Sequence, residues 1–248
     1  MRLDGKTVIV TGGASGFGAG IARKFVAEGA NVMIADLNMA MANELVAELG
    51  VNVRAVEANV AQDTSVKAMV KATLDAFGHI DILINNAGTT HLPTLMEDVS
   101  EEDFDKVFAV NCKSVYLTAK HIVPLFKKQG SGAILNVAST AGVSPRPRLN
   151  WYNASKGWMN TATKAMAVEL APEGIRVNAI NPVAGETPLL KSFMGEDTPE
   201  IRAKFLSTIP LGRFSTPEDM ANAACFLCSD EASMVTGVCM EVDGGRCI

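Results

Sequence analysis

The chain has 248 residues, of which 48% are hydrophobic and 20% charged, and its formal net charge is −5. These values are typical of a folded globular protein and exclude disordered and fibrous classes. The sequence has no run of lysine and arginine that could follow a nucleic-acid backbone, so we expect no nucleic-acid partner. The length fits one α/β domain, and we expect residues 1–248 to form a single one.

The N-terminal segment and the cysteines favour a cytoplasmic location without membrane contact. Asp4 and Gly5 interrupt the apolar residues there, so neither a secretory signal nor a membrane span of about 20 residues is expected. Five scattered cysteines fit a reducing compartment. Cys225 and Cys228 form a CxxC pair inside an apolar helical stretch, which favours core packing over a zinc or redox site. We expect no metal.

Short β-rich segments alternate along the chain with longer segments of helical period. The candidate strands are 7–11, 31–36, 53–60, 80–88, 133–139, 175–182 and 238–245. Most are almost continuously apolar, which is typical of parallel strands covered on both faces. Helical patterns such as 19–29, 65–78 and 152–171 lie between them and complete right-handed β–α–β units. The stretch 183–198 is irregular and opens a candidate substrate loop of about 183–216.

The segment TGGASGFGAG, residues 11–20, follows the first candidate strand and leads into the first helix. The N-terminus of a helix favours a phosphate, and glycine lets a diphosphate approach the backbone. Neither GxGxxG nor GxxxxGK[ST] matches, whereas TGxxxGxG does, at Thr11, Gly12, Gly16 and Gly18. A plain tight turn between strand and helix is the alternative interpretation.

Asp36 ends the second candidate strand. A carboxylate at that place accepts hydrogen bonds from the ribose hydroxyls of an adenosine, and its charge repels a 2′-phosphate. Neither Ala14 nor Leu37 provides the basic side chain that a 2′-phosphate would require. The sequence therefore predicts NAD rather than NADP, although an aspartate that only begins a turn would look the same.

Tyr152 and Lys156 lie four residues apart in YNASK, which places them on one face of a helix. A tyrosine with a pKa near 10 is a poor acid or base at neutral pH. A neighbouring ammonium and a cationic nicotinamide would both stabilise its phenolate. Taken alone, the pair could also be an ordinary contact on a helix surface.

Five motifs in order resemble the short-chain dehydrogenase/reductase (SDR) family, in its compact single-domain branch. They are TGxxxGxG at 11–18, NNAG at 85–88, Asn111 in VNCKS, Ser139 in NVAST and YNASK at 152–156. The resemblance implies a Rossmann-type α/β fold, with a doubly wound sheet of seven parallel strands and helices on both faces. It also implies a homotetramer in which the long helices at 101–128 and 152–171 pack across an interface.

The resemblance further implies a catalytic tetrad of Asn111, Ser139, Tyr152 and Lys156. Ser139 and Tyr152 would bind the reacting oxygen, and Tyr152 would exchange the proton. Lys156 would lower the pKa of Tyr152 and hold the nicotinamide ribose, while Asn111 would bind a water. The residues expected to contact NAD are Gly12, Ser15, Gly16, Phe17, Gly18, Asp36, Leu37, Asn59, Val60, Asn86, Ala87, Gly88, Tyr152, Lys156, Pro182, Val183 and Thr187.

Two of these positions depart from the family pattern. Asn59 stands where an aspartate is common beside the adenine, but an amide can still accept the adenine amino group. Val183 replaces the glycine of NPGxxxT, between Pro182 and Thr187. A valine cannot take glycine-only backbone angles, so we expect a different local path.

The expected substrate contacts are Ser139, Tyr152, His91, Arg146 and Arg148. A guanidinium matches a carboxylate or phosphate, so the arginines could bind an anionic substrate, or they could simply be solvated. His91 could bind a substrate hydroxyl or be incidental. Other residues expected along the pocket are 140–149, Trp151, 183–185, Phe193 and Met194.

Together these features predict an NAD-dependent enzyme that interconverts a small secondary alcohol (a polyol, sugar or hydroxy acid) and its ketone. Reduction of a 3-oxoacyl thioester is an alternative within the same family. A protein that binds NAD without turnover is the alternative from another class.

Overall fold

The computed structural model describes residues 1–248 and contains one sheet with the strand order β3-β2-β1-β4-β5-β6-β7. All strand pairs are parallel. The strands are β1 (Thr7–Thr11), β2 (Asn31–Asp36), β3 (Val53–Glu57), β4 (Ile82–Asn85), β5 (Gly132–Val137), β6 (Ile175–Pro182) and β7 (Cys239–Val242). The chain adds β2 and β3 on one side of β1 and then returns to add β4 to β7 on the other side, as in doubly wound folds. The predicted fold class is therefore confirmed.

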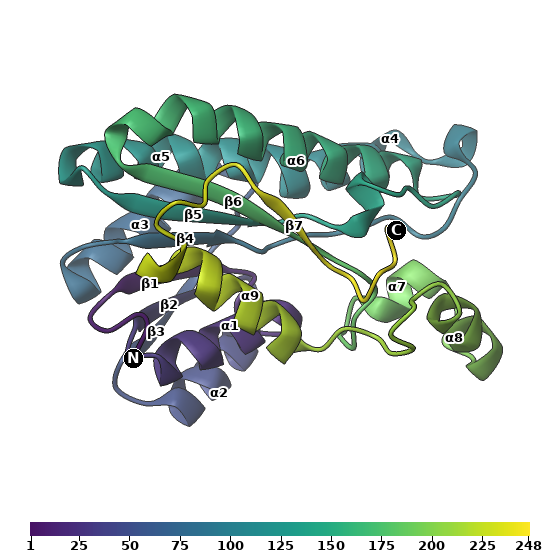
Figure 1. Ribbon diagram of the computed structural model, residues 1–248, viewed down its shortest axis with the longest axis horizontal. Helices are drawn as coiled ribbons and strands as arrows, with labels where there is room; N and C mark the ends of the chain where they lie inside the picture. The colour runs from purple at the N-terminus through teal and green to yellow at the C-terminus, as the bar shows by residue number, and fades with distance from the viewer.

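Helices cover both faces of the sheet, as Figure 1 shows, with α1, α2 and α9 on one face and α3, α5 and α6 on the other. The helices are α1 (Gly16–Ala27), α2 (Met39–Leu49), α3 (Asp63–Phe77), α4 (Glu101–Phe108), α5 (Ser114–Gln129), α6 (Asn150–Leu170), α7 (Leu190–Met194), α8 (Pro199–Leu206) and α9 (Pro217–Cys228). None of them combines the length and the apolar character that crossing a membrane requires.

The central strands are continuously apolar because both of their faces are buried. In β1, Val8 and Val10 point into the cluster that contains α1 and α9, while Ile9 points into the cluster on the opposite face. Cys225 and Cys228 belong to the first cluster, and burial raises the pKa of both thiols. They therefore act as core residues, as the sequence indicated.

Several strands end earlier than their apolar patterns. β3 ends at Glu57 and not at residue 60, and β4 ends at Asn85 and not at residue 88. After β4 the chain is tied to the end of β1, where the Asn86 Nδ2 donates to the Thr11 and Gly12 carbonyls, both at 2.9 Å. These departing residues form the edge of the sheet at which the candidate site lies.

The expected helix at 101–128 is continuous but irregular. A wide π-type turn, Ala109–Lys113, joins α4 to α5 and inserts one extra residue into the helical path. Asn111 lies in this turn and is buried. Such turns are frequent at functional sites, and hydrophobic periodicity alone does not reveal them.

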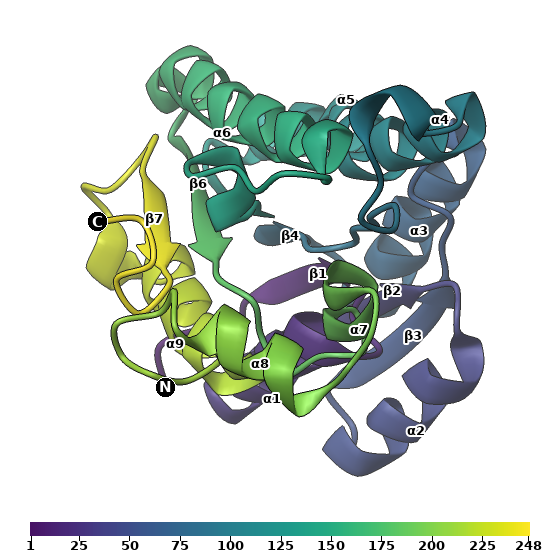
Figure 2. The ribbon, with the colours of Figure 1, turned by 90° about the vertical axis from the view of Figure 1, so that its right-hand side faces the viewer.

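The segment between β6 and α9 contains the two short helices α7 and α8, so it is less irregular than expected. In Figure 2, α7 lies in front of the region of β1 and β2, and α8 lies in front of α1. We call residues 186–214 the lid. Its two ends are paired, because Glu186 N–H donates to the Ser215 carbonyl at 2.9 Å and Ser215 N–H donates to the Ala184 carbonyl at 3.1 Å.

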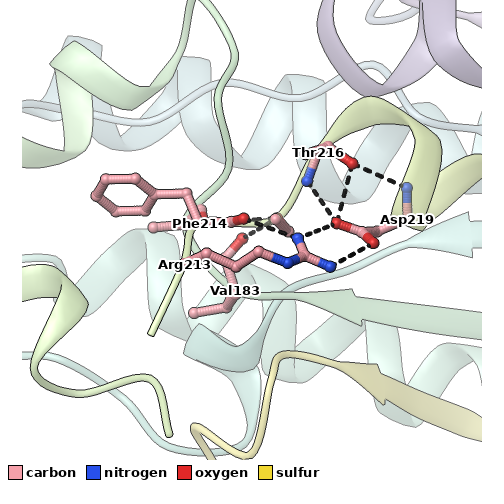
Figure 3. A network of polar contacts seen from close by, with 7 residues as sticks. Val183, Arg213, Phe214, Thr216 and Asp219 are labelled. Carbon is pink, nitrogen blue, oxygen red and sulfur yellow. Dashed lines mark hydrogen bonds and ion pairs between the residues drawn. The ribbon is translucent and has the colours of Figure 1, made fainter. Parts of the chain in front are cut away.

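A polar network holds the C-terminal end of the lid on α9 (Figure 3). Arg213 binds the Asp219 carboxylate through both terminal nitrogens, at 2.6 and 2.8 Å. Thr216 and Asp219 form a capping box, in which the Thr216 hydroxyl accepts from Asp219 N–H and the Asp219 carboxylate accepts from Thr216 N–H. Ser215 Oγ donates to the Val183 carbonyl at 3.2 Å and thereby ties this network to the start of the segment.

Candidate active site

A cavity of about 550 Å³ lies at the C-terminal edge of the strands, beneath the lid. Open α/β sheets bind ligands at this edge, and the volume is typical of a cofactor or substrate site. Most of the predicted site residues line it. They are Gly12, Ser15, Gly16, Phe17, Asp36, Leu37, Asn59, Val60, Asn86, Ala87, Gly88, Ser139, Arg146, Tyr152, Lys156, Pro182, Val183 and Thr187. Gly18, His91, Asn111 and Arg148 do not.

The glycine-rich loop owes its composition to backbone shape and close packing. Gly12 and Gly16 have φ values of +60° and +51°, which strain any other residue. A side chain at Gly18 would collide with the Gly12 carbonyl, so this residue packs α1 against the loop rather than lining the cavity. The sequence offered two interpretations of these glycines, close approach of a diphosphate and a tight turn, and their backbone angles show that the turn contributes.

The N-terminus of α1 faces the cavity with free backbone donors. Ser15 is the N-cap residue, yet its side chain makes no capping hydrogen bond, and the first turn holds no acidic residue. Ser15, Gly16 and Phe17 all line the cavity. A diphosphate fits such an end because its oxygens accept from these N–H groups and favour the helix dipole.

Asp36 is fixed beside this loop. Its Oδ2 accepts from Ala14 N–H at 3.0 Å and its Oδ1 from Asn38 N–H at 2.9 Å. A carboxylate oxygen can accept more than one hydrogen bond, so both remain able to bind ribose hydroxyls. Asn59 accepts from Ala61 N–H through Oδ1 at 3.0 Å and likewise keeps capacity for a ligand.

Tyr152, Lys156 and Ser139 meet at the other end of the cavity. Tyr152 and Lys156 are 6% and 4% exposed and lie one turn apart on α6. The Lys156 Nζ lies 5.9 Å from the centroid of the Tyr152 ring and donates to the Val137 carbonyl at 2.9 Å. Ser139 follows β5, and its hydroxyl accepts from Ala141 N–H at 3.0 Å.

Burial dominates the ionisation of the two α6 residues. It raises the pKa of Tyr152 to about 12, although the Ser139 hydroxyl and the charge of Arg146 act in the opposite direction. It also lowers the pKa of Lys156 to about 8. We expected Lys156 to lower the pKa of Tyr152, but it is not among the groups that do so here. Tyr152 is therefore a neutral phenol at neutral pH, able to donate a proton.

The Asn111 side chain makes contacts that fix structure around the tetrad. Its Oδ1 accepts from Thr89 N–H at 2.9 Å, and its Nδ2 donates to the Thr89 carbonyl at 2.9 Å and to Ser155 Oγ at 3.0 Å. These bonds join the loop after β4 to α6. The water contact expected of Asn111 stays a prediction, since these side-chain atoms bind protein groups.

Val183 adopts an ordinary backbone conformation. It does not have a positive φ, which among the non-glycine residues occurs at Arg148 alone. Its side chain is buried with Leu190 and Met194 of the lid. The need for glycine falls at Gly185, where a side chain would collide with the Phe17 ring. The glycine of this segment therefore lies at position 185, two residues after Val183.

The substrate end of the cavity combines lid residues with the loop after β5. The Phe193 ring of α7 lies 5.0 Å from the Tyr152 ring, centroid to centroid. The Arg146 guanidinium lies 4.3 Å from the centroid of the Phe205 ring on α8. Sequence reasoning missed Phe205, which also lines the cavity, because nothing local in the sequence connects α8 with residue 146.

Four residues expected along the substrate pocket lie elsewhere. His91 is buried, and its Nδ1 is 2.8 Å from the Leu92 carbonyl. Arg148 is exposed, Met194 is buried in the lid, and Trp151 packs edge-on against Phe104. None of the four lines the cavity, because the turn that carries Arg148 directs it outward while the loop buries His91.

The comparisons with known proteins agree with this geometry. A family model described as Enoyl-(Acyl carrier protein) reductase matches residues 12–246. The chain belongs to the SDR family. Among its SDR relatives, 4-formylbenzenesulfonate dehydrogenase TsaC1/TsaC2 of Comamonas testosteroni is 49% identical over 250 residues, which cover 99% of both chains. The 3-oxoacyl-[acyl-carrier-protein] reductase FabG of Thermotoga maritima is 41% identical and covers 100% of both chains.

Solved SDR structures share the whole architecture. A 3-ketoacyl-(acyl-carrier-protein) reductase from Brucella melitensis, complexed with NADH, matches with a TM-score of 0.95 and 49% identity, over 99% of this chain and 100% of that chain. Levodione reductase matches with a TM-score of 0.95 and 31% identity, over 99% of both chains. The protein is therefore an SDR oxidoreductase.

Proposed function

We propose that this protein transfers a hydride between NAD(H) and an alcohol or carbonyl substrate, with Tyr152 as the acid and base. One observation carries the proposal: Tyr152, Lys156 and Ser139 line the same cavity as Asp36 and the N-terminus of α1. A protein that only bound a dinucleotide would have no use for a buried lysine beside a buried tyrosine, because burying a charged or polar group is unfavourable.

The described residues fit NAD. The N–H groups at the start of α1 would hold the diphosphate, Asp36 the adenosine ribose, and Lys156 the nicotinamide ribose. A 2′-phosphate would meet the Asp36 carboxylate, which disfavours NADP. The structure with NADH from Brucella melitensis supports the same assignment through its likeness to this chain. When bound, the cofactor would supply the hydride donor in its reduced form and, in its oxidised form, the hydride acceptor and a positive charge near the substrate.

The protein contributes proton transfer, position and exclusion of water. In reduction, the Tyr152 phenol would donate its proton to the substrate oxygen, and in oxidation the phenolate would remove the alcohol proton. The Ser139 hydroxyl would donate a hydrogen bond to the same oxygen. Lys156, anchored on the Val137 carbonyl, places an amine close to this pair. Phe193 packs on the Tyr152 ring and shields it from solvent.

The names of the relatives point to substrates with a carbonyl or hydroxyl group. One 49% identical relative is named for 4-formylbenzenesulfonate, an aromatic aldehyde that carries an anion. We propose a small alcohol and carbonyl pair for this chain, with polyols, sugars and hydroxy acids as the classes to examine first. Reduction of a 3-oxoacyl thioester is the second candidate, because a 41% identical relative and a 49% identical structure carry that name.

An absorbance assay of NADH with purified protein tests the proposal. The panel contains secondary alcohols, polyols, hydroxy acids, aryl aldehydes and 3-oxoacyl thioesters. We expect Tyr152→Phe to lower kcat by about 1000-fold, the range of one general acid or base. NADH binding, measured by fluorescence titration, is expected to stay near that of the wild type.

Tyr116→Phe is the matched control, since Tyr116 is the other tyrosine of the chain and is 58% exposed. It should retain full turnover. Undiminished turnover in Tyr152→Phe would remove Tyr152 from the mechanism. Tight NADH binding without turnover of any substrate would favour the protein that binds NAD without catalysis.

A further inference from the structure

Arg146 reaches the substrate end of the cavity with its side-chain donors free. No carboxylate lies within ion-pair distance of its guanidinium, and its one hydrogen bond is made by its carbonyl, which accepts from Asn153 Nδ2 at 2.7 Å. The guanidinium stacks on Phe205. Stacking occupies the face of the group and leaves the N–H donors along its edge available.

Arg246, from the segment after β7, lies next to the loop that carries Arg146, although it does not itself line the cavity. Its Nη1 donates to Ser144 Oγ at 3.1 Å, two residues from Arg146, and its Nε is buried without a partner. The nearest acid in the sequence, Asp243, is engaged elsewhere: its oxygens accept from Gly245 and Cys247 N–H at 2.9 and 2.8 Å. Burial, and then the charge of Arg246, lower the pKa of Arg146 to about 10.

The charges around the cavity are unevenly distributed. Asp36 is the one acidic residue that lines it, beside the glycine-rich loop. Lys106, Arg146 and Lys156 are the basic residues. Arg246 is a like charge behind Arg146, and an anion bound at Arg146 would offset the repulsion between the two guanidinium groups.

We propose that Arg146 and Arg246 form a clamp for a carboxylate or sulfonate group on the substrate, at a distance from the reacting carbon, in which Arg146 provides the N–H donors from the cavity wall and Arg246 adds positive charge from behind that wall. This inference rests on the proposed function and specifies its substrate class as an anionic alcohol or aldehyde. An arginine fork matches the two oxygens of such a group. Because Arg146 stacks on α8, a bound anion would also hold the lid against the cavity. The clamp joins residues 100 positions apart, which explains why sequence reasoning found Arg146 and missed Arg246.

Two substrates that differ in charge provide the test: 4-carboxybenzaldehyde and its methyl ester, each reduced with NADH. We expect Arg146→Gln and Arg246→Gln to lower kcat/KM for the carboxylate by about 30-fold, the range of hydrogen bonds to a charged group. The ester should be little affected by either change. Arg148→Gln is the matched control, since Arg148 lies two residues away and outside the cavity, and it should leave both substrates unchanged. Equal losses for the two substrates, or no loss for either, would overturn the clamp.

Calorimetric titration with benzoate and benzenesulfonate separates this proposal from the proposed function. We expect the wild type to bind at least one of the two anions about tenfold more tightly than Arg146→Gln does. If binding requires both arginines while no aldehyde is turned over, the clamp stands and the dehydrogenase proposal fails. If the ester is reduced while neither anion binds the wild type, the clamp is wrong and the dehydrogenase stands. Absence of both turnover and anion binding would overturn both.

Discussion

Lys156 and Tyr152 lie side by side on α6, with the lysine nitrogen 5.9 Å from the centroid of the tyrosine ring. Burial works against charge on both groups, holding the pKa of Tyr152 at about 12 and that of Lys156 at about 8. The protein by itself therefore keeps the tyrosine protonated across the physiological range. This state suits the direction that consumes a proton, which is reduction of a carbonyl.

The two directions should respond to pH in opposite ways. Oxidation needs the phenolate, and since the pKa of Tyr152 lies above the assay range, kcat/KM for an alcohol should rise with pH, by up to about tenfold per unit. Reduction needs the phenol and should not gain from raising the pH. Initial rates in both directions between about pH 6 and pH 10 measure this. An oxidation rate that falls steadily over that range would contradict the assignment.

Asp36 should determine the choice of cofactor. We expect wild-type kcat/KM to favour NAD over NADP by at least about tenfold, or 1.4 kcal/mol. Asp36→Asn should reduce this preference, because the charge that repels a 2′-phosphate is lost. Glu57→Gln is the control, since Glu57 is the register partner of Asp36 on β3 and does not line the cavity. A wild type that prefers NADP would show that Asp36 has been misinterpreted.

Removal of the Thr216 cap should loosen the lid. Thr216→Ala removes the hydroxyl that accepts from Asp219 N–H, so we expect a stability loss of about 1 kcal/mol and a higher KM. Ser100→Ala removes the equivalent cap of α4, where Ser100 Oγ accepts from Asp103 N–H at 3.1 Å. It should cost similar stability and leave KM unchanged. Urea unfolding measures the stability of each variant, and substrate titrations measure its KM. If KM were the same in Thr216→Ala as in Ser100→Ala, the cap would not act on substrate binding through the lid.

Asn111→Ala should destabilise the fold as well as slow turnover. The change leaves the half-buried Thr89 N–H and carbonyl without their partners, at an expected cost of about 1 kcal/mol. Ser155→Ala removes one of the three contacts of Asn111 and should cost less. Urea unfolding of both variants compares them. If Asn111→Ala kept the stability of the wild type and lost turnover alone, the structural role would be wrong.

The sequence predicted the sheet well because burial on both faces leaves an almost unbroken apolar pattern in the central strands. It did not predict where β3 and β4 end, since Val60 and Ala87 continue the apolar pattern after the backbone has left the sheet. The sequence also did not predict the π-type turn at Ala109–Lys113. One extra residue in a helix changes the direction of side chains without a distinctive composition.

In the candidate site, short motifs were informative and distant pairs were not. Tyr152 and Lys156 are one helical turn apart, so their spacing in the sequence predicted that they share one face of a helix. Arg246 and Phe205 reach Arg146 through the ends of β7 and the lid, and only the folded arrangement reveals them. His91 and Arg148 had suitable chemistry at suitable positions, but loop geometry directs them away from the cavity.

The bridge between Gly185 and Ser215 means that the segment they enclose begins and finishes at nearly the same point in space. Such an insert can change its sequence or length with little strain on the sheet, since the cost of closing a loop grows slowly with its length. The sheet therefore places little constraint on the length of residues 186–214. Because Thr187, Phe193 and Phe205 lie within this segment, exchanging it for the corresponding stretch of a relative would change the wall of the cavity around Tyr152 and leave the sheet in place.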